Sequence, residues 1–251
     1  MKSKIAALFA LTLCIASAFA GPGIEPRKVA LLSLIGDFMT VVTYRPGIGS
    51  HLDKNARETF AIPDATFDHT ALLAASDAIK KADASASVVL IAAPSTGMRT
   101  EQRHLLKDQR FVPTDELSAA LTKEGATHLL LMTKYRAAAR LQAKNDMIGS
   151  GTLEGLGFYV DRQTRLIRSD TGEIGRGFLA PYAFFKISLI ELSSSTVLKE
   201  QAVTASTALS SARDKDGDDP WDALSPGQKV AILRALIRNA TEKAIPTIFQ
   251  P

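Results

Sequence analysis

The stretch TDELSAALTKEGATHLLLMT, residues 114–133, decides the fold of this chain. Thr114 is a favourable N-cap, two acids follow in the first turn, where the helix dipole favours negative charge, and Gly125 is a typical helix stop. The apolar run over residues 126–133 then predicts a strand that is buried on both faces. A helix that is followed after a short turn by a buried strand indicates part of a β-α-β unit.

Two earlier segments of the chain extend this pattern. Residues 28–35 and 87–93 are apolar runs without polar alternation, which predicts two further buried strands. Between them, Asp68 is expected to cap a helix over about 68–81 that has one apolar and one charged stripe. Strands and helices that alternate with short turns predict parallel strands joined by right-handed crossovers.

The carboxy-terminal half has a different pattern. Residues 184–192 and 196–205 alternate apolar and polar side chains on either side of a serine turn, which predicts an antiparallel hairpin with one wet face. Ser225 and Pro226 open a last helix, and Pro246 is expected to end it. We therefore predict an α/β fold, with α+β as the alternative: a mixed sheet with parallel β-α-β units in the amino-terminal half, followed by an antiparallel hairpin and a terminal helix.

The first twenty residues, MKSKIAALFALTLCIASAFA, predict export. They combine a charged start, an apolar stretch too short to span a bilayer comfortably and an Ala-Phe-Ala cleavage site. We expect a signal peptide over 1–20 and a single domain over 21–251, located in the periplasm or secreted. The only cysteine, Cys14, lies in the segment that is removed, and Leu13 stands where a lipoprotein signal requires a small residue. Cleavage is therefore favoured over a lipid anchor.

Composition narrows the classes of partner. Without residues 1–20, Lys plus Arg falls from 30 to 28 against 26 acids, so the formal charge is +2 rather than +4. This excess is too small to indicate nucleic-acid binding. The chain is 46% apolar, which indicates a buried core, yet no later apolar run reaches the roughly eighteen residues of a transmembrane helix.

Several stretches together resemble a known family. They are VALLSLIGD (29–37), DELSAALTKEGATHLLLMTKY (115–135), the hairpin FKISLIELSSSTVLKEQAVT (185–204) and the closing amphipathic helix. In this order they resemble the periplasmic α/β domain of the curli-transport lipoprotein and the TolB amino-terminal domain. The resemblance covers about half of the mature chain and carries no functional residue across. It implies an envelope protein that works by assembling with partners.

A glycine-rich segment interrupts the expected sheet at about 145–182. Its glycines alternate with aromatic and apolar residues such as Phe158 and Tyr159, which predicts a long hairpin inserted in the domain. One interpretation is an exposed β-arm or an ordered loop that folds back on the domain. The other is an interaction arm that adds a strand to another subunit or closes a barrel with other arms in a membrane, with Phe158 and Tyr159 as binding residues.

The loop after the first strand is the second candidate site. Asp37 follows the first buried strand, where α/β proteins place ligand-binding groups, and Tyr44, Arg45 and the pair His51-x-Asp53 come soon after. These residues could bind an anion or a phosphoester. Without a phosphate-binding glycine motif or a nucleophile elbow, a polar connection with Asp37 as a turn cap is the competing interpretation.

Other residue clusters give no catalytic or metal signal. The four histidines have no metal-ligand spacing, and His128 lies in an apolar strand, where a hydrogen-bonded core imidazole is expected. The acidic run 214–219 lacks the glycine and glutamate positions of a calcium loop. We therefore expect no metal and no cofactor. The preferred function is an exported, non-catalytic envelope protein that binds a protein partner or assembles with itself; the alternative is a periplasmic enzyme or a binder of small anions or phosphoesters.

Overall fold

A computed structural model describes residues 27–36, 38–46, 53–93, 96–143, 146–167, 172, 174–210 and 219–249. The predicted signal peptide, Asp37, His51 and residues 214–218 of the acidic run lie outside these residues. The elements are β1 (Lys28–Ser33), β2 (Phe38–Thr43), β3 (Ala56–Ala61), η1 (Pro63–Ala65), α1 (Thr66–Ala82), β4 (Ser87–Leu90), α2 (Thr96–Thr100), η2 (Gln102–His104), β5 (Leu106–Lys107), β6 (Arg110–Phe111), α3 (Asp115–Lys123), β7 (His128–Lys134), β8 (Arg136–Ala138), β9 (Leu141–Gln142), β10 (Met147–Ile148), β11 (Thr152–Ile167), β12 (Ile174–Glu191), β13 (Thr196–Ser206), β14 (Leu209–Ser210), η3 (Pro220–Ala223) and α4 (Pro226–Phe249).

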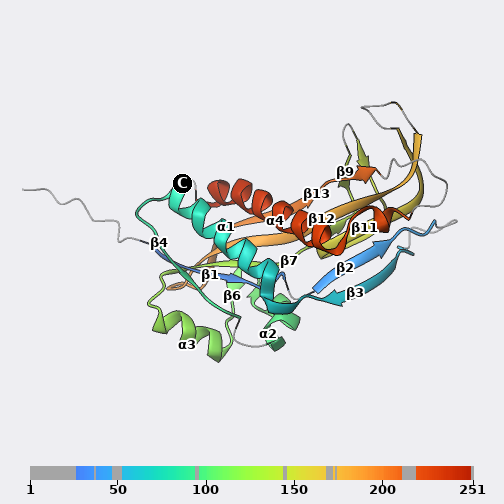
Figure 1. Ribbon diagram of the computed structural model, residues 1–251. Helices are drawn as coiled ribbons and strands as arrows, with labels where there is room; N and C mark the ends of the chain where they lie inside the picture. Colours follow the sequence, from blue (N-terminus) through green and yellow to red (C-terminus); the bar gives the residue numbers. More distant parts are fainter. Residues whose placement is uncertain are drawn as a thin grey trace, which may run out of the picture.

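The long strand β12 organises the sheet (Figure 1). On one side it pairs with β13 and, near its start, with β14. On the other side it pairs with β11 up to Phe184 and with β7 from Phe185 onward, so the sheet forks between these two residues. One branch continues from β11 to β2 and β3, and the other continues from β7 to β1 and β4.

Both parallel and antiparallel pairs occur, which confirms the predicted mixed sheet. Strand β1 runs parallel to β4 and to β7, as the β-α-β pattern predicts. Strands β12 and β13 form the predicted antiparallel hairpin. Thr114 caps α3 by accepting a hydrogen bond from the Leu117 amide at 3.3 Å, and Gly125 follows the helix with a φ of +60°.

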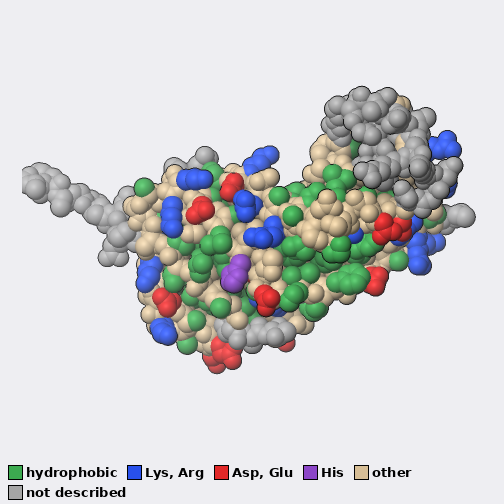
Figure 2. All heavy atoms as spheres, in the orientation of Figure 1, with side chains coloured by type: hydrophobic (Ala, Val, Ile, Leu, Met, Phe, Trp, Pro, Cys, Tyr) green, Lys and Arg blue, Asp and Glu red, His purple; other side chains and the backbone are tan. Residues whose placement is uncertain are grey.

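Alternate residues of the strands face two different layers. Helices α1 and α4 lie side by side over one face, called here the helical face, and bury residues such as Phe185, Ile187 and Leu189 in one large apolar cluster (Figure 1). The opposite, open face carries two separate apolar clusters. One is covered by α3 with the segment after α2, and the other lies against β8 to β10. Figure 2 shows acidic, basic and hydrophobic side chains interspersed on the surface seen in that view.

Part of the glycine-rich segment lies within the sheet. Over residues 156–160, strand β11 lies between β2 and β12, whereas residues 165–167 at its far end pair, among the described residues, only with the start of β12. Close approach explains one of the glycines: a Cβ at Gly157 would lie 1.9 Å from the Thr40 carbonyl oxygen. This position accepts no side chain without displacing β2.

Two predicted helix boundaries were wrong. Helix α1 begins at Thr66 after Ala65, so Asp68 is inside the first turn and is not the N-cap. Helix α4 continues through Pro246 to Phe249, because the buried side chains of Ile245, Ile248 and Phe249 hold the last turn against the core although the proline lacks an N–H. Among the described residues, no helix has the length and apolar character needed to cross a membrane.

Candidate functional site

The loop after β1 is organised by a buried carboxylate. Asp68 Oδ1 accepts hydrogen bonds from the Ser33 hydroxyl at 2.6 Å and from the amides of Ile35 and Gly36 at 3.0 and 3.1 Å. Its other oxygen pairs with Arg99 of α2. Asp68 is 3% exposed. In many α/β proteins, backbone amides at this place bind a ligand, but here Asp68 already occupies them.

A buried glutamine ties the same edge of the sheet together. Gln102 donates to the Leu34 carbonyl at 3.2 Å and accepts from the Lys134 amide at 2.7 Å. It therefore joins the chain after β1 to the carboxyl end of β7. Together with Asp68 and Arg99, it fills the edge with internal hydrogen bonds.

The open face has a polar gap between its two apolar clusters. Along β12, the residues that face it change from Tyr182 and Phe184 to Lys186 and Ser188, and then to Ile190. Ser188 is buried and its hydroxyl donates to Glu200 at 3.2 Å, whereas Lys186 is partly exposed and pairs with the same carboxylate. A strip of polar side chains therefore separates the two coverings.

This strip forms what we call the polar trough, three adjoining hollows of about 410, 390 and 370 Å³ that are all lined by Lys134. Two ion pairs cross it: Arg103 with Glu154 at 2.9 Å, and Lys186 with Glu200 at 2.8 Å. At the end nearest β3, the first hollow is lined by Phe38, Thr40, Arg57, Thr59, Arg136 and Tyr182, among others.

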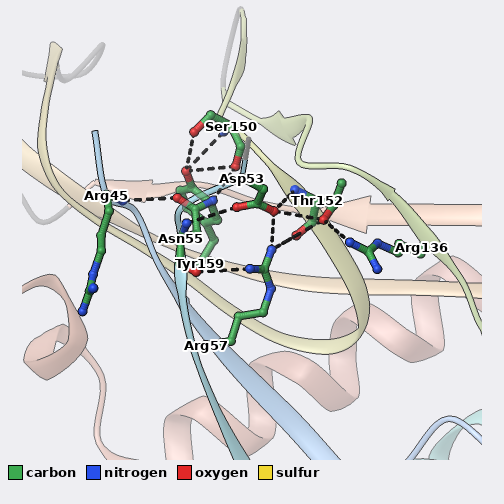
Figure 3. Close-up of polar contacts among 8 residues, drawn as sticks. All are labelled: Arg45, Asp53, Asn55, Arg57, Arg136, Ser150, Thr152 and Tyr159. Atoms are coloured by element: carbon green, nitrogen blue, oxygen red, sulfur yellow. Dashed lines mark hydrogen bonds and ion pairs between the residues drawn. The ribbon is translucent and has the colours of Figure 1, made fainter. Parts of the chain in front are cut away.

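A hydrogen-bond network anchors that end of the trough (Figure 3). Asp53 accepts from the Thr152 amide at 2.8 Å, from its hydroxyl at 3.0 Å and from the Asn55 amide at 3.1 Å, and it pairs with Arg57. Burial raises the pKa of the Asp53 carboxyl, but the hydrogen bonds from Arg57, Thr152 and Asn55 outweigh burial and hold that pKa below its usual range. Arg136 donates to the Thr152 hydroxyl at 3.2 Å from the neighbouring strand.

The predicted loop residues lie partly in this network. Tyr44 and Arg45 follow β2, a strand that the sequence analysis did not predict. The Arg45 amide donates to Asn55 at 3.2 Å, but its side chain points away from Asp53 (Figure 3). Tyr44 packs against the apolar cluster near β8 and β9. Asp37 and His51 lie outside the described residues, so their roles stay predictions.

Phe158 and Tyr159 lie inside the protein. Both side chains are 0% exposed. Phe158 meets the Trp221 ring edge to face with centroids 5.6 Å apart, and Tyr159 stacks on Phe178 at 5.8 Å while its hydroxyl accepts from the Ser150 amide at 3.1 Å. Neither ring is at the surface of the described chain, and their predicted role in binding stays a prediction.

The sequence analysis missed Arg57 and Arg136. The spacing Asp53-x-Asn55-x-Arg57 places the three residues on one side of an extended chain, and this alternation is a signal that could have indicated Arg57. Arg136 has no such local signal. It reaches Thr152 because β8 pairs with the start of β11.

Tyr182 beside the trough and His128 at the start of β7 both have shifted pKa values. The Tyr182 hydroxyl donates to the Thr40 carbonyl at 3.1 Å, and burial raises the pKa of this phenol well above its usual range. On β7, burial and Arg27 lower the pKa of His128 despite the opposing effect of Glu191. The part of the chain that the structure describes contains no group of three or more His, Cys, Asp or Glu residues that could hold a metal ion.

Comparisons with known proteins give only distant likenesses. No family model and no curated protein matches the sequence. Among solved structures, two PelC dodecamers from Paraburkholderia phytofirmans are 13% and 14% identical, with TM-scores of 0.32 and 0.30; each comparison covers 90% of this chain and 91% of that one. Protein XCC0632 of DUF330, from Xanthomonas campestris, is 10% identical over 90% of this chain and 87% of its own, with a TM-score of 0.38. Similarities this low carry no functional argument.

Proposed function

We propose that this protein is exported to the cell envelope, where it binds a protein partner in the polar trough and catalyses no reaction. The observation that carries the proposal is the trough itself: a strip of charged and hydrogen-bonding side chains that crosses the open face between two apolar clusters. Export is supported by the signal-peptide pattern of residues 1–20.

The dimensions of the trough favour an extended segment of chain. It passes over β3, β2, β11, the fork at β12 and β13, a distance of about 20 Å when neighbouring strands lie roughly 4.8 Å apart. An extended peptide of roughly six residues has this length. Because the trough presents both signs of charge, with Arg57 and Lys186 against Glu154 and Glu200, it suits a polar peptide with its own backbone donors and acceptors.

The state of the reactive groups supports binding over catalysis. A general acid or base needs a pKa near the working pH, whereas the Tyr182 phenol is held far above it and donates to a backbone carbonyl. Asp53, whose pKa is lowered, is committed to four hydrogen bonds with its neighbours.

A second copy of the chain is the other form of partner. Among the described residues, the outer side of β13 has a strand partner only at Thr196, so most of this edge offers backbone groups for strand addition. The resemblance to the curli-transport lipoprotein and the TolB amino-terminal domain implies the same kind of function.

The alternative, a small-ligand site in the loop after β1, has weaker support. Two amides that would hold an anion there, those of Ile35 and Gly36, are already bound to Asp68.

Photocrosslinking in living cells tests the proposal. A photoreactive amino acid replaces Thr59 in the trough or, as a control, Asp77 on the exposed side of α1, in the full chain expressed in the organism that makes it. We expect a defined protein adduct from position 59 and none from position 77, with a mature amino terminus at Gly21 in the envelope fraction. An adduct with the chain itself indicates self-assembly. Absence of any adduct specific to position 59 would contradict the proposal.

A further inference from the structure

Two arginines converge on one hydroxyl at the end of the polar trough. Arg57 of β3 places Nη2 2.9 Å from the Thr152 carbonyl oxygen and 3.5 Å from the Thr152 hydroxyl. Arg136 of β8 places its own Nη2 3.2 Å from the same hydroxyl. The two guanidinium groups approach Thr152 from different strands (Figure 3), and both line the first hollow.

Positive charge is in excess at this place. Two guanidinium groups this close repel each other, and the repulsion falls when an anion lies between them. Asp53 is bound to Arg57, and Glu154 is bound to Arg103. With Arg136, these arginines and carboxylates are three cations and two anions.

The geometry of the donors selects the kind of anion. Arg57 already divides its N–H groups between the Asn55 carbonyl, Asp53 and Thr152, whereas Arg136 donates to Thr152 at 3.2 Å and has five N–H donors in its fork. The two oxygens of a carboxylate would be taken by that fork alone. A phosphate group can place two oxygens on the Arg136 fork and still offer others to Arg57. The Thr152 hydroxyl donates its one proton to Asp53 and accepts from both arginines, so it positions them.

We propose that Arg136 and Arg57, held together by the Thr152 hydroxyl that accepts from both, form a subsite for a phosphate group at one end of the polar trough. Asp53 is a positioning residue: it holds Arg57 and Thr152 in place and does not touch the phosphate. The subsite goes beyond the proposed partner binding, because it names a further chemical group that one end of the trough recognises.

The surrounding surface gives the group room to enter. The hollow has a volume of about 410 Å³, and its walls add the hydroxyl groups of Thr40 and Thr59. Arg136 is exposed, and the Arg57 side chain is 38% exposed, so both remain accessible from solvent.

Calorimetric titration of the mature full chain with inorganic phosphate, at constant ionic strength set with chloride, tests the subsite. We expect Arg136→Gln to weaken phosphate binding at least tenfold. Arg136→Lys should weaken it less, because lysine keeps the charge and loses the fork. The matched control is Arg140→Gln, an exposed arginine four residues further along the same segment, which should bind phosphate like the wild type. Circular dichroism and urea unfolding verify that each variant is folded.

The possible outcomes test whether the subsite exists, identify the kind of molecule that carries the phosphate group, and distinguish the subsite from partner binding. Equal heats with phosphate and chloride, or an equal loss in Arg140→Gln, would overturn the subsite. Vesicles of phosphatidylcholine with and without phosphatidylglycerol distinguish the sources. Binding only to the vesicles that contain phosphatidylglycerol, reversed by free phosphate, assigns a lipid headgroup, whereas phosphate binding without vesicle binding assigns a small phosphate compound. Crosslinking from position 59 is an independent readout, so failure of the partner proposal and failure of the subsite are distinguishable.

Discussion

The two faces of the same sheet are covered in different ways. On the helical face, the alternate residues of β12 are continuously apolar, and two long helices, α1 and α4, bury them in one cluster. On the open face, Lys186 and Ser188 interrupt the apolar series, and two separate coverings leave the polar trough between them. The change from apolar to polar side chains along one strand therefore accompanies the change from a closed face to an open one.

The comparison predicts that one face supplies stability and the other supplies the surface for binding. Buried apolar area supplies most of the free energy of folding, so the helical face should carry the stability. The trough is lined by exposed and half-buried polar groups, whose replacement should leave stability almost unchanged while altering binding.

The largest effect is expected where the two faces are joined at the sheet edge. Asp68 belongs to α1 on the helical face, and its partner Arg99 belongs to α2 on the open side. Replacing Asp68 with alanine leaves Arg99 buried without its counter-charge and frees two amides, which should lower the free energy of unfolding by about 4 kcal/mol. Urea unfolding measures this loss, with Asp77→Ala on the same helix as control. A loss as small as that of Asp77→Ala would show that the edge does not join the faces energetically.

A direct test compares one residue from each face. Leu233 of α4 is 0% exposed in the helical cluster, and its replacement by alanine should cost about 3 kcal/mol through lost burial and an unfilled cavity. Thr59→Ala in the trough should change stability by no more than about 0.5 kcal/mol. Both are measured by urea unfolding at pH 7. An equal loss of unfolding free energy in the two variants would contradict the expectation that the helical face carries most of the stability.

Gly157 tests the contact between β11 and β2. An added methyl group would overlap the Thr40 carbonyl and lie 2.8 Å from the Tyr182 hydroxyl, so Gly157→Ala should destabilise the fold by about 2 kcal/mol. The control is Gly227→Ala in the first turn of α4, where the new methyl group meets nothing within 4 Å. Thermal unfolding should show a lower Tm for the first variant only; an unchanged Tm would mean that the two strands separate without cost.

The smallest expected effect is a dependence on pH at the end of the trough. Because the pKa of Asp53 in the folded state lies below its ordinary value of 3.8, its ionised form adds stability above that pH, and the contribution is lost as the pH falls through the folded-state pKa. The stability difference between wild type and Asp53→Asn should therefore be constant from pH 7 to 5 and shrink below 3.8. Thr59→Ala, which removes no titrating group, should show no such change. A difference that grows in acid would contradict the assigned role of Asp53.

Short-range sequence patterns were enough to predict the helices and strands that such patterns specify. Caps, helix stops and continuous apolar runs located α3, β1 and β7, and alternation located the β12–β13 hairpin. Strand β3 carries five exposed residues out of six, so it lacks the apolar pattern on which such predictions depend. Pro246 was expected to end the last helix, as proline does in an isolated helix. The helix continues because its neighbours in the last turn are buried in the core.

The candidate site depends on contacts between distant residues. Arg57 meets Thr152 across 95 positions of the chain, and Asp68 meets Arg99 across 31. A carboxylate at the start of a helix has the same sequence pattern whether it caps the helix or pairs with a remote arginine, which is why Asp68 was assigned to the wrong role. Phe158 and Tyr159 were named as binding residues of a possible interaction arm because no local pattern indicates that β11 runs between two other strands.

The pairing of α1 with α4 sets an order for folding. Arg234 of α4 reaches the Thr70 hydroxyl of α1, 164 positions earlier in the chain, and the two helices share one apolar cluster. A nascent polypeptide therefore cannot complete this layer until α4 has left the ribosome, and contacts this remote slow folding. In the export that we propose, this delay would keep the polypeptide in the unfolded form that a translocation channel requires.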